Sequence, residues 1–229
     1  MQYDKRDLIK LFKEASTWHW SSKPKYYSYP LDFTLEASGY EKTTVQVIKD
    51  SCTNFKYYTP KSLLLNMSSD SQPGGGVERG ATAQEEFLCR TSNLYNCLPK
   101  KSQRLHYLEE LEAIYNDQVI FKKDANYQPI KPHTVAVISM AALKRPRLPL
   151  SDHHKQIYLQ KMKLLLDIAA KHKHYDLILS AWGCGAYKNP PETIARLFKQ
   201  AFEEHVIKFN VIFLINDNNY DIFSEVFQV

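Results

Sequence analysis

Apolar and polar positions along the second half of the chain predict strands and helices in alternation. Continuous apolar runs predict three buried strands, at 133–142, 175–182 and 210–217, because a strand covered on both faces carries apolar residues at successive positions. Apolar residues at helical spacing predict three helices, at 151–173, 190–206 and 218–227. Ser151 is a suitable cap for the first of these helices, and Pro opens the second.

The first half has a weaker pattern. A charged amphipathic segment predicts a helix that ends near Ala15, and the Tyr- and Pro-rich residues 21–33 predict either a loop or an edge strand. Three further strands and one helix are expected, the strands at 43–50, 61–69 and 117–124 and the helix at 83–95. The run at 61–69 is apolar at successive positions, so this strand is expected to be buried on both faces.

Regular alternation of strands and helices predicts one α/β domain whose mainly parallel sheet has helices on both faces. We divide the chain into an N-terminal extension packed on the core, residues 1–43, and the core itself, residues 44–229. Ligands of such sheets bind at the carboxyl ends of the strands. Two glycine-containing loops, 73–80 and 183–189, follow predicted strands there. They predict a pocket with two walls.

Composition supports a globular fold. Of the 229 residues, 44% are hydrophobic and 24% charged, which is enough apolar material for a core. No apolar run approaches the roughly 18 residues of a membrane span, and the first residues lack the apolar stretch of a signal peptide. We therefore expect no membrane association. The four cysteines show no metal-site spacing, so we expect reduced thiols, no metal or cofactor, and a cytoplasmic location. We also expect a monomer.

Charge adds one expectation about partners. The net charge is +5, and lysine and arginine are concentrated between Lys100 and Lys173. Such a surface attracts polyanions, which leaves direct nucleic-acid binding open beside the simpler interpretation of a solvated basic face. The motif KRPR at 144–147 is compatible with a nuclear import signal, although its place after an apolar strand favours the start of a loop.

The loop GCGAYKN, residues 183–189, has two interpretations. Gly183 and Gly185 flank Cys184, so the backbone can turn sharply and bring its N–H groups close to a ligand. Backbone donors before a helix favour anions, phosphate above all. A tight turn that needs small residues explains the spacing equally well. Tyr187 either stacks on a sugar or base or is a packing residue.

The segment PGGGVERGATAQEE, residues 73–86, is neither a Walker loop nor a dinucleotide fingerprint. Its three successive glycines leave no side chains beside the backbone, which suits close approach of a ligand. Glu85 and Glu86 follow in the first turn of a helix. Thr82 and Glu85 match a capping box. Since successive helical residues point about 100° apart, the other glutamate is free to face the loop, and a desolvated carboxyl there is suited to general acid/base chemistry.

Together these motifs resemble those of the microbial-type poly(ADP-ribose) glycohydrolases. GGG followed after seven residues by QEE is similar to the family signature. The resemblance continues through the segments LLLNMSSDSQPGGGVERGATAQEEFLCRTSNLY, VAVISMAA and LILSAWGCGAYKNPPETIARLF, and covers roughly residues 44–223. It implies a macrodomain-like, three-layer α/β fold and the hydrolysis of ribose–ribose O-glycosidic bonds in poly(ADP-ribose), with release of ADP-ribose.

The resemblance also implies roles for individual residues. Glu86 would be the general acid/base that protonates the leaving ribose oxygen and then assists the attack of water. Glu85 would hold ribose hydroxyls on the leaving side, and Gln84 would order the loop. One carboxylate would be enough if the substrate's own diphosphate stabilises the oxocarbenium-like centre, whereas most glycosidases use two.

Further residues would bind the substrate. Asn66 would contact the distal ribose, and Gly74, Gly75 and Gly76 would let their loop wrap the diphosphate and that ribose. The second diphosphate wall would consist of Gly183, Cys184, Gly185 and Ala186. Tyr187 stands where the family commonly has Phe and would pack on the distal ribose.

The sequence departs from the family at Glu78 and Arg79, where we would expect apolar or neutral residues, so substrate choice is expected to depend on these positions. Residues 18–40 match poorly, and whether they cover the adenine or brace the sheet stays open. Two alternatives remain: a non-catalytic ADP-ribose reader, and a hydrolase of mono-ADP-ribose conjugates on protein or nucleic acid. ADP-ribose, its polymer or ADP-ribosylated macromolecules are the expected partners.

Overall fold

The computed structural model describes residues 3–18, 22–31, 34–35, 39–99, 107–144 and 146–229. They form an α/β fold, as the sequence predicts. The strands are β1 (Lys25–Ser28), β2 (Thr44–Ile48), β3 (Ser62–Ser68), β4 (Glu112–Lys123), β5 (Pro129–Ala141), β6 (Asp176–Leu179) and β7 (Asn210–Leu214). The α-helices are α1 (Lys5–Ala15), α2 (Gln84–Thr91), α3 (Leu94–Cys97), α4 (Asp152–Lys171), α5 (Pro191–Glu204) and α6 (Asn219–Phe227), and the 3₁₀ helices are η1 (Phe55–Tyr57) and η2 (Val77–Arg79).

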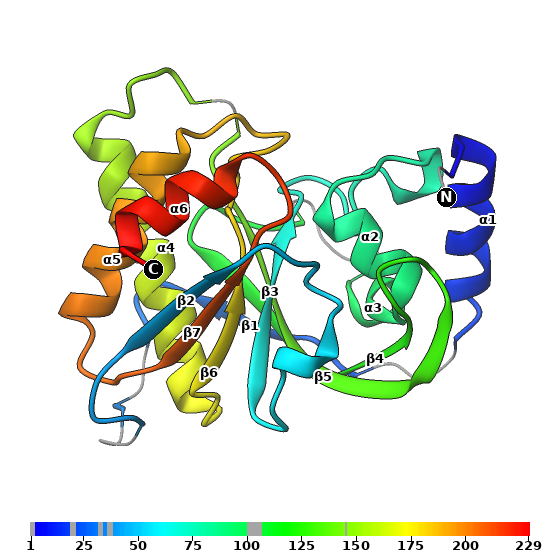
Figure 1. Cartoon of the computed structure of the whole chain (residues 1–229), viewed down its shortest axis with the longest axis horizontal. Helices are drawn as coiled ribbons and strands as arrows, with labels where there is room; N and C mark the ends of the chain where they lie inside the picture. The colour runs from blue at the N-terminus through cyan, green and yellow to red at the C-terminus, as the bar shows by residue number, and fades with distance from the viewer. Residues whose placement is uncertain (1–2, 19–21, 32–33, 36–38, 100–106, 145) are drawn as a thin grey trace.

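The seven strands form one mainly parallel sheet in the order β1-β4-β5-β3-β6-β7-β2. The pairs β5–β3, β3–β6, β6–β7 and β7–β2 are parallel. Among the strands of the described residues, β4 with β5 and β1 with β4 are the antiparallel pairs. As Figure 1 shows, α4, α5 and α6 lie on one side of this sheet and α1, α2 and α3 on the other.

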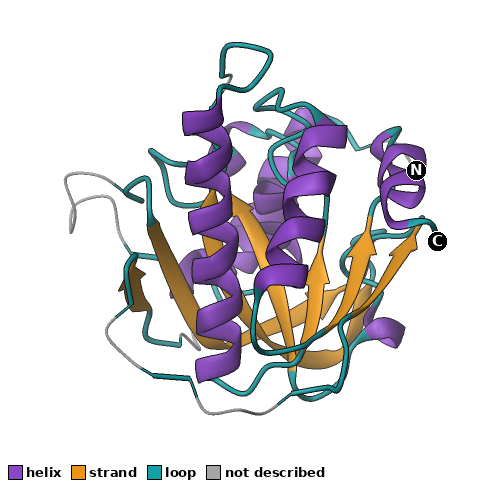
Figure 2. Cartoon of the chain, turned by 90° about the vertical axis from the view of Figure 1, so that its left-hand side faces the viewer, coloured by secondary structure: helices purple, strands orange, loops and turns teal. Residues whose placement is uncertain are grey.

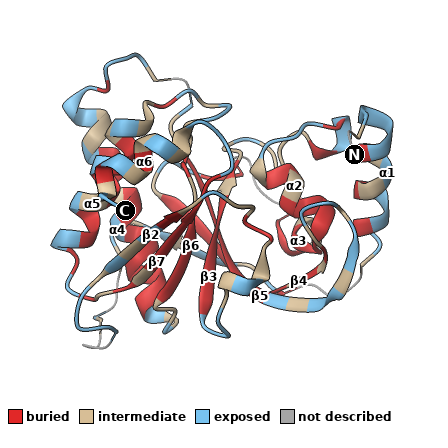
Figure 3. Ribbon diagram, in the orientation of Figure 1, coloured by how far each residue is buried: buried red, intermediate tan, exposed pale blue. Residues whose placement is uncertain are grey.

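Both faces of the central strands are buried, which explains their continuous apolar runs. Leu63 and Leu65 of β3 belong to the core under α4, α5 and α6, whereas Leu64 between them belongs to the core on the opposite face. Figure 2 shows long helices crossing one face of the sheet, and Figure 3 shows the buried strands between the two helical layers. The predicted three-layer arrangement is therefore confirmed.

The predicted helix at 83–95 is wrong in its extent. The chain forms α2 and α3 instead, separated at Ser92 and Asn93. Ser92 is extended, and Asn93 exchanges hydrogen bonds with Ile120 of β4 through its backbone N–H (3.1 Å) and its side-chain oxygen (2.8 Å). Pairing with a neighbouring strand thus interrupts the helix, which helical periodicity along the sequence does not reveal. β4 begins at Glu112, earlier than the predicted 117, because residues 112–115 pair with β1.

The N-terminal residues pack on the core. β1 extends the sheet beyond β4, so residues 25–28 brace the sheet rather than cover a ligand. The division at residue 43 stays a prediction. Residue 145 of the KRPR motif and residues 100–106 of the basic region lie outside the described residues, as do 19–21, 32–33 and 36–38 within or beside the poorly matched segment. Within the described part of the chain, no helix is long and apolar enough to cross a membrane.

Candidate active site

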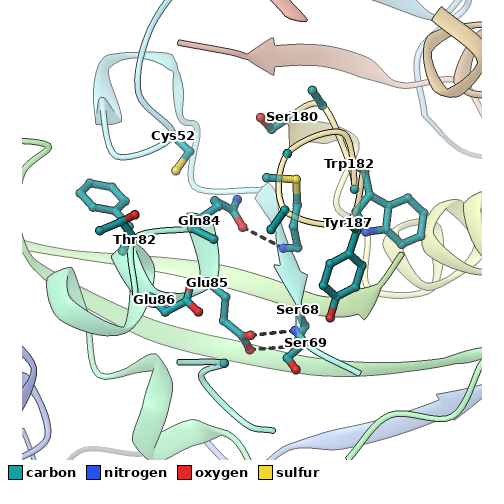
Figure 4. A pocket seen from close by; sticks show the side chains of 18 of the residues that line it. Cys52, Ser68, Ser69, Thr82, Gln84, Glu85, Glu86, Ser180, Trp182 and Tyr187 are labelled. Carbon is teal, nitrogen blue, oxygen red and sulfur yellow. Dashed lines mark hydrogen bonds between the residues drawn. The ribbon is translucent and has the colours of Figure 1, made fainter. Parts of the chain in front are cut away.

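A cavity of about 870 Å³ lies across the carboxyl ends of the five parallel strands. The two glycine loops form two of its walls, as expected. Loops after β2, β5 and β7 and the turn between β4 and β5 complete it with residues that include Asp50, Cys52, Ala125, Asn126, Ala142, Lys144, Asn216 and Asp217. Figure 4 shows Gln84, Glu85 and Glu86 at the cavity, with Trp182 and Tyr187 of the second wall across from them.

Helix α2 brings the three QEE side chains to the cavity. Gln84 holds the start of the helix against β3, because its side-chain NH₂ donates to the Leu65 carbonyl (2.8 Å) and its oxygen accepts from the Met67 N–H (2.8 Å). These are the bonds that a neighbouring strand would make. Gln84 therefore fixes where the next two residues, Glu85 and Glu86, enter the cavity.

Glu85 is 3% exposed and accepts four hydrogen bonds. Its donors are the Ser69 N–H (2.7 Å), the Ser68 hydroxyl (2.7 Å), the Gly74 N–H (3.2 Å) and the Asn66 side-chain NH₂ (3.4 Å). Burial, and to a smaller extent the charge of Glu86, raise the pKa of Glu85 to about 7 against the opposing effect of the Ser69, Ser68 and Asn66 donors. This carboxyl is held in place and titrates near neutral pH.

Glu86 is 7% exposed and has a different set of contacts. One carboxylate oxygen accepts from the Gly76 N–H (2.8 Å). The other is buried and has no partner among the described residues. A buried polar atom without a partner is uncommon and calls for a cause such as a bound group or a catalytic role. Glu86 is therefore the carboxyl of the pair with an oxygen left for a proton, a water or a substrate group.

The predicted capping box is wrong. The N-cap of α2 is Ala83, no side chain caps the helix, and Thr82 is exposed. The Glu85 carboxylate cannot reach back to the cap because it is turned toward the loop that follows β3, where Ser68 and Ser69 hold it. Tertiary hydrogen bonds have replaced the local pair that the spacing suggested.

The three glycines make room for these carboxylates. Gly74 and Gly75 have φ values of +71° and +57°, which side chains other than glycine rarely adopt. A Cβ at Gly75 would lie 2.4 Å from Glu86 Oε1 and 3.2 Å from Glu85 Oε2, and one at Gly76 would lie 2.8 Å from the Ala81 Cβ. The side-chain-free surface that we expected to face a ligand is thus closely approached by the two glutamates.

The two glycines of the second loop have different surroundings. Gly183 has a φ of +76°, and a Cβ there would lie 2.6 Å from the Ala142 Cβ, so a tight turn does require glycine. Gly185 has open space around it. Gly185 and Ala186 line the cavity, and their backbone N–H groups have no protein partner among the described residues. Both interpretations of this loop therefore apply, the turn at Gly183 and the available donors at Gly185 and Ala186.

Cys184 does not take part in the candidate active site. Its N–H donates to Ala181 (3.1 Å), its thiol contacts the Trp182 carbonyl (3.6 Å), and it does not line the cavity. Burial raises the pKa of the Cys184 thiol to about 12, so it is not a thiolate at neutral pH.

Tyr187 joins the two walls. Its hydroxyl donates to the Asp70 carboxylate (3.3 Å) and accepts from the Asp70 N–H (3.3 Å). Lys144 lies 3.9 Å from the same carboxylate. The hydroxyl that distinguishes this residue from Phe thus links the second loop to the chain after β3, and Tyr187 still lines the cavity.

Most of the predicted site residues come together, and three do not line the cavity. Besides Cys184, these are Asn66 and Gly74. Asn66 is fully buried behind Glu85 and donates to Ser139 Oγ (3.0 Å), so its contact with a ribose stays a prediction. Sequence reasoning missed Ser68 and Ser69, although small polar residues at the end of a buried strand were a signal for groups that hold a carboxylate.

Residues 14–127 match the family described as microbial-type PARG, catalytic domain, PARG being poly(ADP-ribose) glycohydrolase. This segment holds the first glycine loop and both glutamates. The comparison with curated proteins found no match.

Solved structures of such enzymes share the fold of the whole chain. The poly(ADP-ribose) glycohydrolase of Thermomonospora curvata, bound to the inhibitor ADP-HPD, superposes with a TM-score of 0.71 at 22% identity, over 94% of this chain and 88% of that one. The enzyme of Deinococcus radiodurans in complex with ADP-ribose has a TM-score of 0.69 at 24% identity, over 98% and 91%. The resemblance and the fold predicted from the sequence are confirmed.

Proposed function

With residues 14–127 matching the catalytic domain of microbial-type poly(ADP-ribose) glycohydrolases and the fold shared throughout, we propose that this protein hydrolyses ribose–ribose bonds in poly(ADP-ribose) and releases ADP-ribose. One observation carries this proposal: the carboxyl of Glu86 reaches a cavity of about 870 Å³ with one oxygen fixed by Gly76 and the other without a partner. A binding protein has no need of such a group.

The reaction divides the work between the two glutamates. The bond from the anomeric carbon to the leaving ribose oxygen breaks while a carboxyl proton of Glu86 passes to that oxygen. A water molecule then adds to the anomeric carbon and returns a proton to Glu86, so the enzyme is regenerated. Glu85 holds its position through four hydrogen bonds and orients ribose hydroxyls. Its raised pKa lets the pair retain a proton near neutral pH.

The rest of the cavity binds and orients the substrate. The unpartnered N–H groups of Gly185 and Ala186 are donors for the diphosphate. Because these N–H groups already hold the diphosphate in place, they need not move when positive charge develops at the anomeric carbon. The substrate's diphosphate near that carbon supplies the second negative charge that most glycosidases draw from a second carboxylate.

The test is the release of ADP-ribose from auto-modified polymer by wild type and by Glu86→Gln. The amide keeps the size of the side chain but carries no proton to donate, so we expect release to fall by a factor on the order of 10²–10⁴, typical of a lost general acid, with ADP-ribose still bound. Glu192→Gln, an exposed change on α5, is the matched control and is expected to leave activity unchanged.

Two results would contradict the proposal. Equal release by wild type and Glu86→Gln would remove Glu86 from the mechanism. A wild type that binds ADP-ribose but cleaves no polymer would identify a reader, or a hydrolase of mono-ADP-ribose conjugates if it cleaves those instead.

A further inference from the structure

The cavity continues past the two glutamates, away from the second glycine loop. In Figure 4, Trp182 and Tyr187 lie on one side of Glu85 and Glu86, and Thr82 lies on the other. The residues that line this far part are Arg79, Thr82, Ala83, Phe87, Ala125 and Asn126, and we call it the outer lobe. It consists of η2, the start of α2 and the turn between β4 and β5.

Arg79 gives the outer lobe a positive charge close to the reacting carboxyl. A Cβ placed on Gly76 would lie 3.6 Å from Glu86 Oε1 and 3.7 Å from Arg79 Nη2, so the two side chains flank one point. Arg79 is exposed and has no ion-pair partner among the described residues. Its side-chain contact is with the neutral amide oxygen of Gln72 at 3.4 Å. The guanidinium is therefore available to an anionic group of a ligand.

The other cation lining the described part of the cavity is already engaged. Lys144 lies 3.9 Å from the Asp70 carboxylate and over the Tyr187 ring, on the side of the second glycine loop. The two sides of the glutamates therefore differ, with backbone donors and a paired lysine on one and an unpaired guanidinium on the other.

Phe87 adds an aromatic surface to the outer lobe. It follows Glu86 directly, is half-buried and lines the cavity. Its ring contacts Tyr127 of the β4–β5 turn with centroids 5.5 Å apart, and Tyr127 in turn packs edge-on against Tyr3 at 5.1 Å. The Tyr3 hydroxyl also donates to the Asn126 carbonyl (2.9 Å). The N-terminal segment thus holds the turn against Phe87, and the ring is presented on a supported surface.

An aromatic ring and an unpaired guanidinium that line the same lobe suit a nucleotide, since bases and sugars stack on rings and phosphates bind arginine. In poly(ADP-ribose) the group beyond the cleaved bond is the adenosine and diphosphate of the next unit. Resting on the function proposed above, we propose that the outer lobe binds this second nucleotide unit, with Arg79 on a phosphate and Phe87 against the base or sugar, and so makes a polymer a better ligand than a single ADP-ribose.

The experiment measures binding of two probes, ADP-ribose and its dimer joined by the ribose–ribose bond, to protein that carries Glu86→Gln and does not cleave them. We expect the dimer to bind about tenfold more tightly, the effect of one charge-assisted contact. Adding Arg79→Gln is expected to bring the dimer to within about twofold of the monomer while the affinity for the monomer stays unchanged. Phe87→Leu, which keeps most of the side-chain volume, is expected to reduce the preference in the same way.

Arg196→Gln on α5 removes the same charge at an exposed position away from the cavity and should keep the preference for the dimer. Equal affinities for dimer and monomer before Arg79 is changed would overturn the outer lobe as a subsite and leave the proposed function standing. If the preference for the dimer survived both Arg79→Gln and Phe87→Leu, the outer lobe would likewise not be the subsite, and the proposed function would still stand. Failure to bind either probe would overturn the proposed function and this inference together.

Discussion

Two adjacent glutamates have different hydrogen-bond partners here because their surroundings differ. Glu85 accepts four hydrogen bonds from the chain around β3, and Glu86 accepts one. Identical side chains one position apart on a helix point in different directions, and each meets a different part of the loop. The glycines complete this arrangement, since Gly75 is where both carboxylates approach the backbone.

Gly75→Ala is therefore expected to damage the site from within. Its φ of +57° strains any side chain, and the new Cβ would lie 2.4 Å from Glu86 Oε1. We expect a loss of stability of about 1–3 kcal/mol and a loss of activity that approaches that of Glu86→Gln. Urea unfolding and polymer hydrolysis measure the two effects.

Gly185→Ala is the matched change in the other loop. Nothing lies within 4 Å of its added Cβ, so its unfolding midpoint should stay at the wild-type value. Stability of Gly75→Ala equal to that of Gly185→Ala would contradict the account of the first loop.

At the scale of elements, the N-terminal helix supports the first glycine loop. Arg90 of α2 is fully buried, and its guanidinium donates to the Leu8 carbonyl of α1 (3.1 Å) and to the Ala81 carbonyl of the loop after η2. At Gly80 the two backbones are so close that a Cβ would lie 3.2 Å from the Lys5 carbonyl oxygen. One side chain thus joins α1, the glycine loop and the helix that carries both glutamates.

Arg90→Lys keeps the charge but loses the fork that reaches both carbonyls. We expect unfolding to become easier by about 1–3 kcal/mol, since buried hydrogen bonds are lost, amide hydrogen exchange in α1 to become faster, and polymer hydrolysis to slow. Arg196→Lys, on the exposed side of α5, should change none of these. Unaltered exchange in α1 of the Arg90 variant would show that the helix is held by other contacts.

For the molecule as a whole, His172, which is half-buried, and Glu85, which is buried, have opposite effects on stability between pH 4 and 7. At the sheet edge, His172 accepts or donates a hydrogen bond with the Tyr27 hydroxyl (2.8 Å) and stacks on Tyr115 at 3.9 Å. Burial, and then the charges of Lys25, His174 and Lys171, lower the pKa of His172 from 6.5 to about 4. Its stabilising contribution is therefore complete above pH 6.5 and is lost as the pH falls toward 4.

Glu85 acts in the other direction. Its pKa rises from 4.5 in the unfolded chain to about 7 in the folded protein, so the unfolded state loses its proton first and stability declines as the pH rises between these values. A shift of this size corresponds to on the order of 3 kcal/mol. Near pH 5–6 the change in unfolding free energy with pH that His172 causes is largely offset by the opposite change that Glu85 causes.

The variant His172→Gln removes the contribution of His172 and leaves that of Glu85. The variant lacks the ring that must stay neutral, so the difference in unfolding free energy between wild type and variant should shrink as the pH is lowered from 6.5 to 4. Urea unfolding at several pH values measures it. Glu85→Gln should show the reverse, a difference that falls as the pH rises from 4.5 to 7. A constant difference for His172→Gln would mean that the ring does not titrate in this range.

The sequence by itself determined the order of the elements, the parallel sheet and the two loops at its carboxyl end. These follow from local periodicity and turn residues, which short stretches of chain carry. It also pointed to Glu85 and Glu86 and to other residues that line the cavity, among them Gly75, Gln84 and Tyr187.

Only the tertiary structure decided what each of these residues touches. Glu85 accepts from Ser68 and Ser69 instead of forming a capping box, and pairing with β4 interrupts the helix predicted at 83–95. Asn66 lies behind Glu85 and does not line the cavity. Each outcome depends on groups that are far apart in the chain or on adjacent strands. Hydrogen bonds across the fold compete with local ones, and the competition is settled by burial and geometry that a linear pattern does not contain.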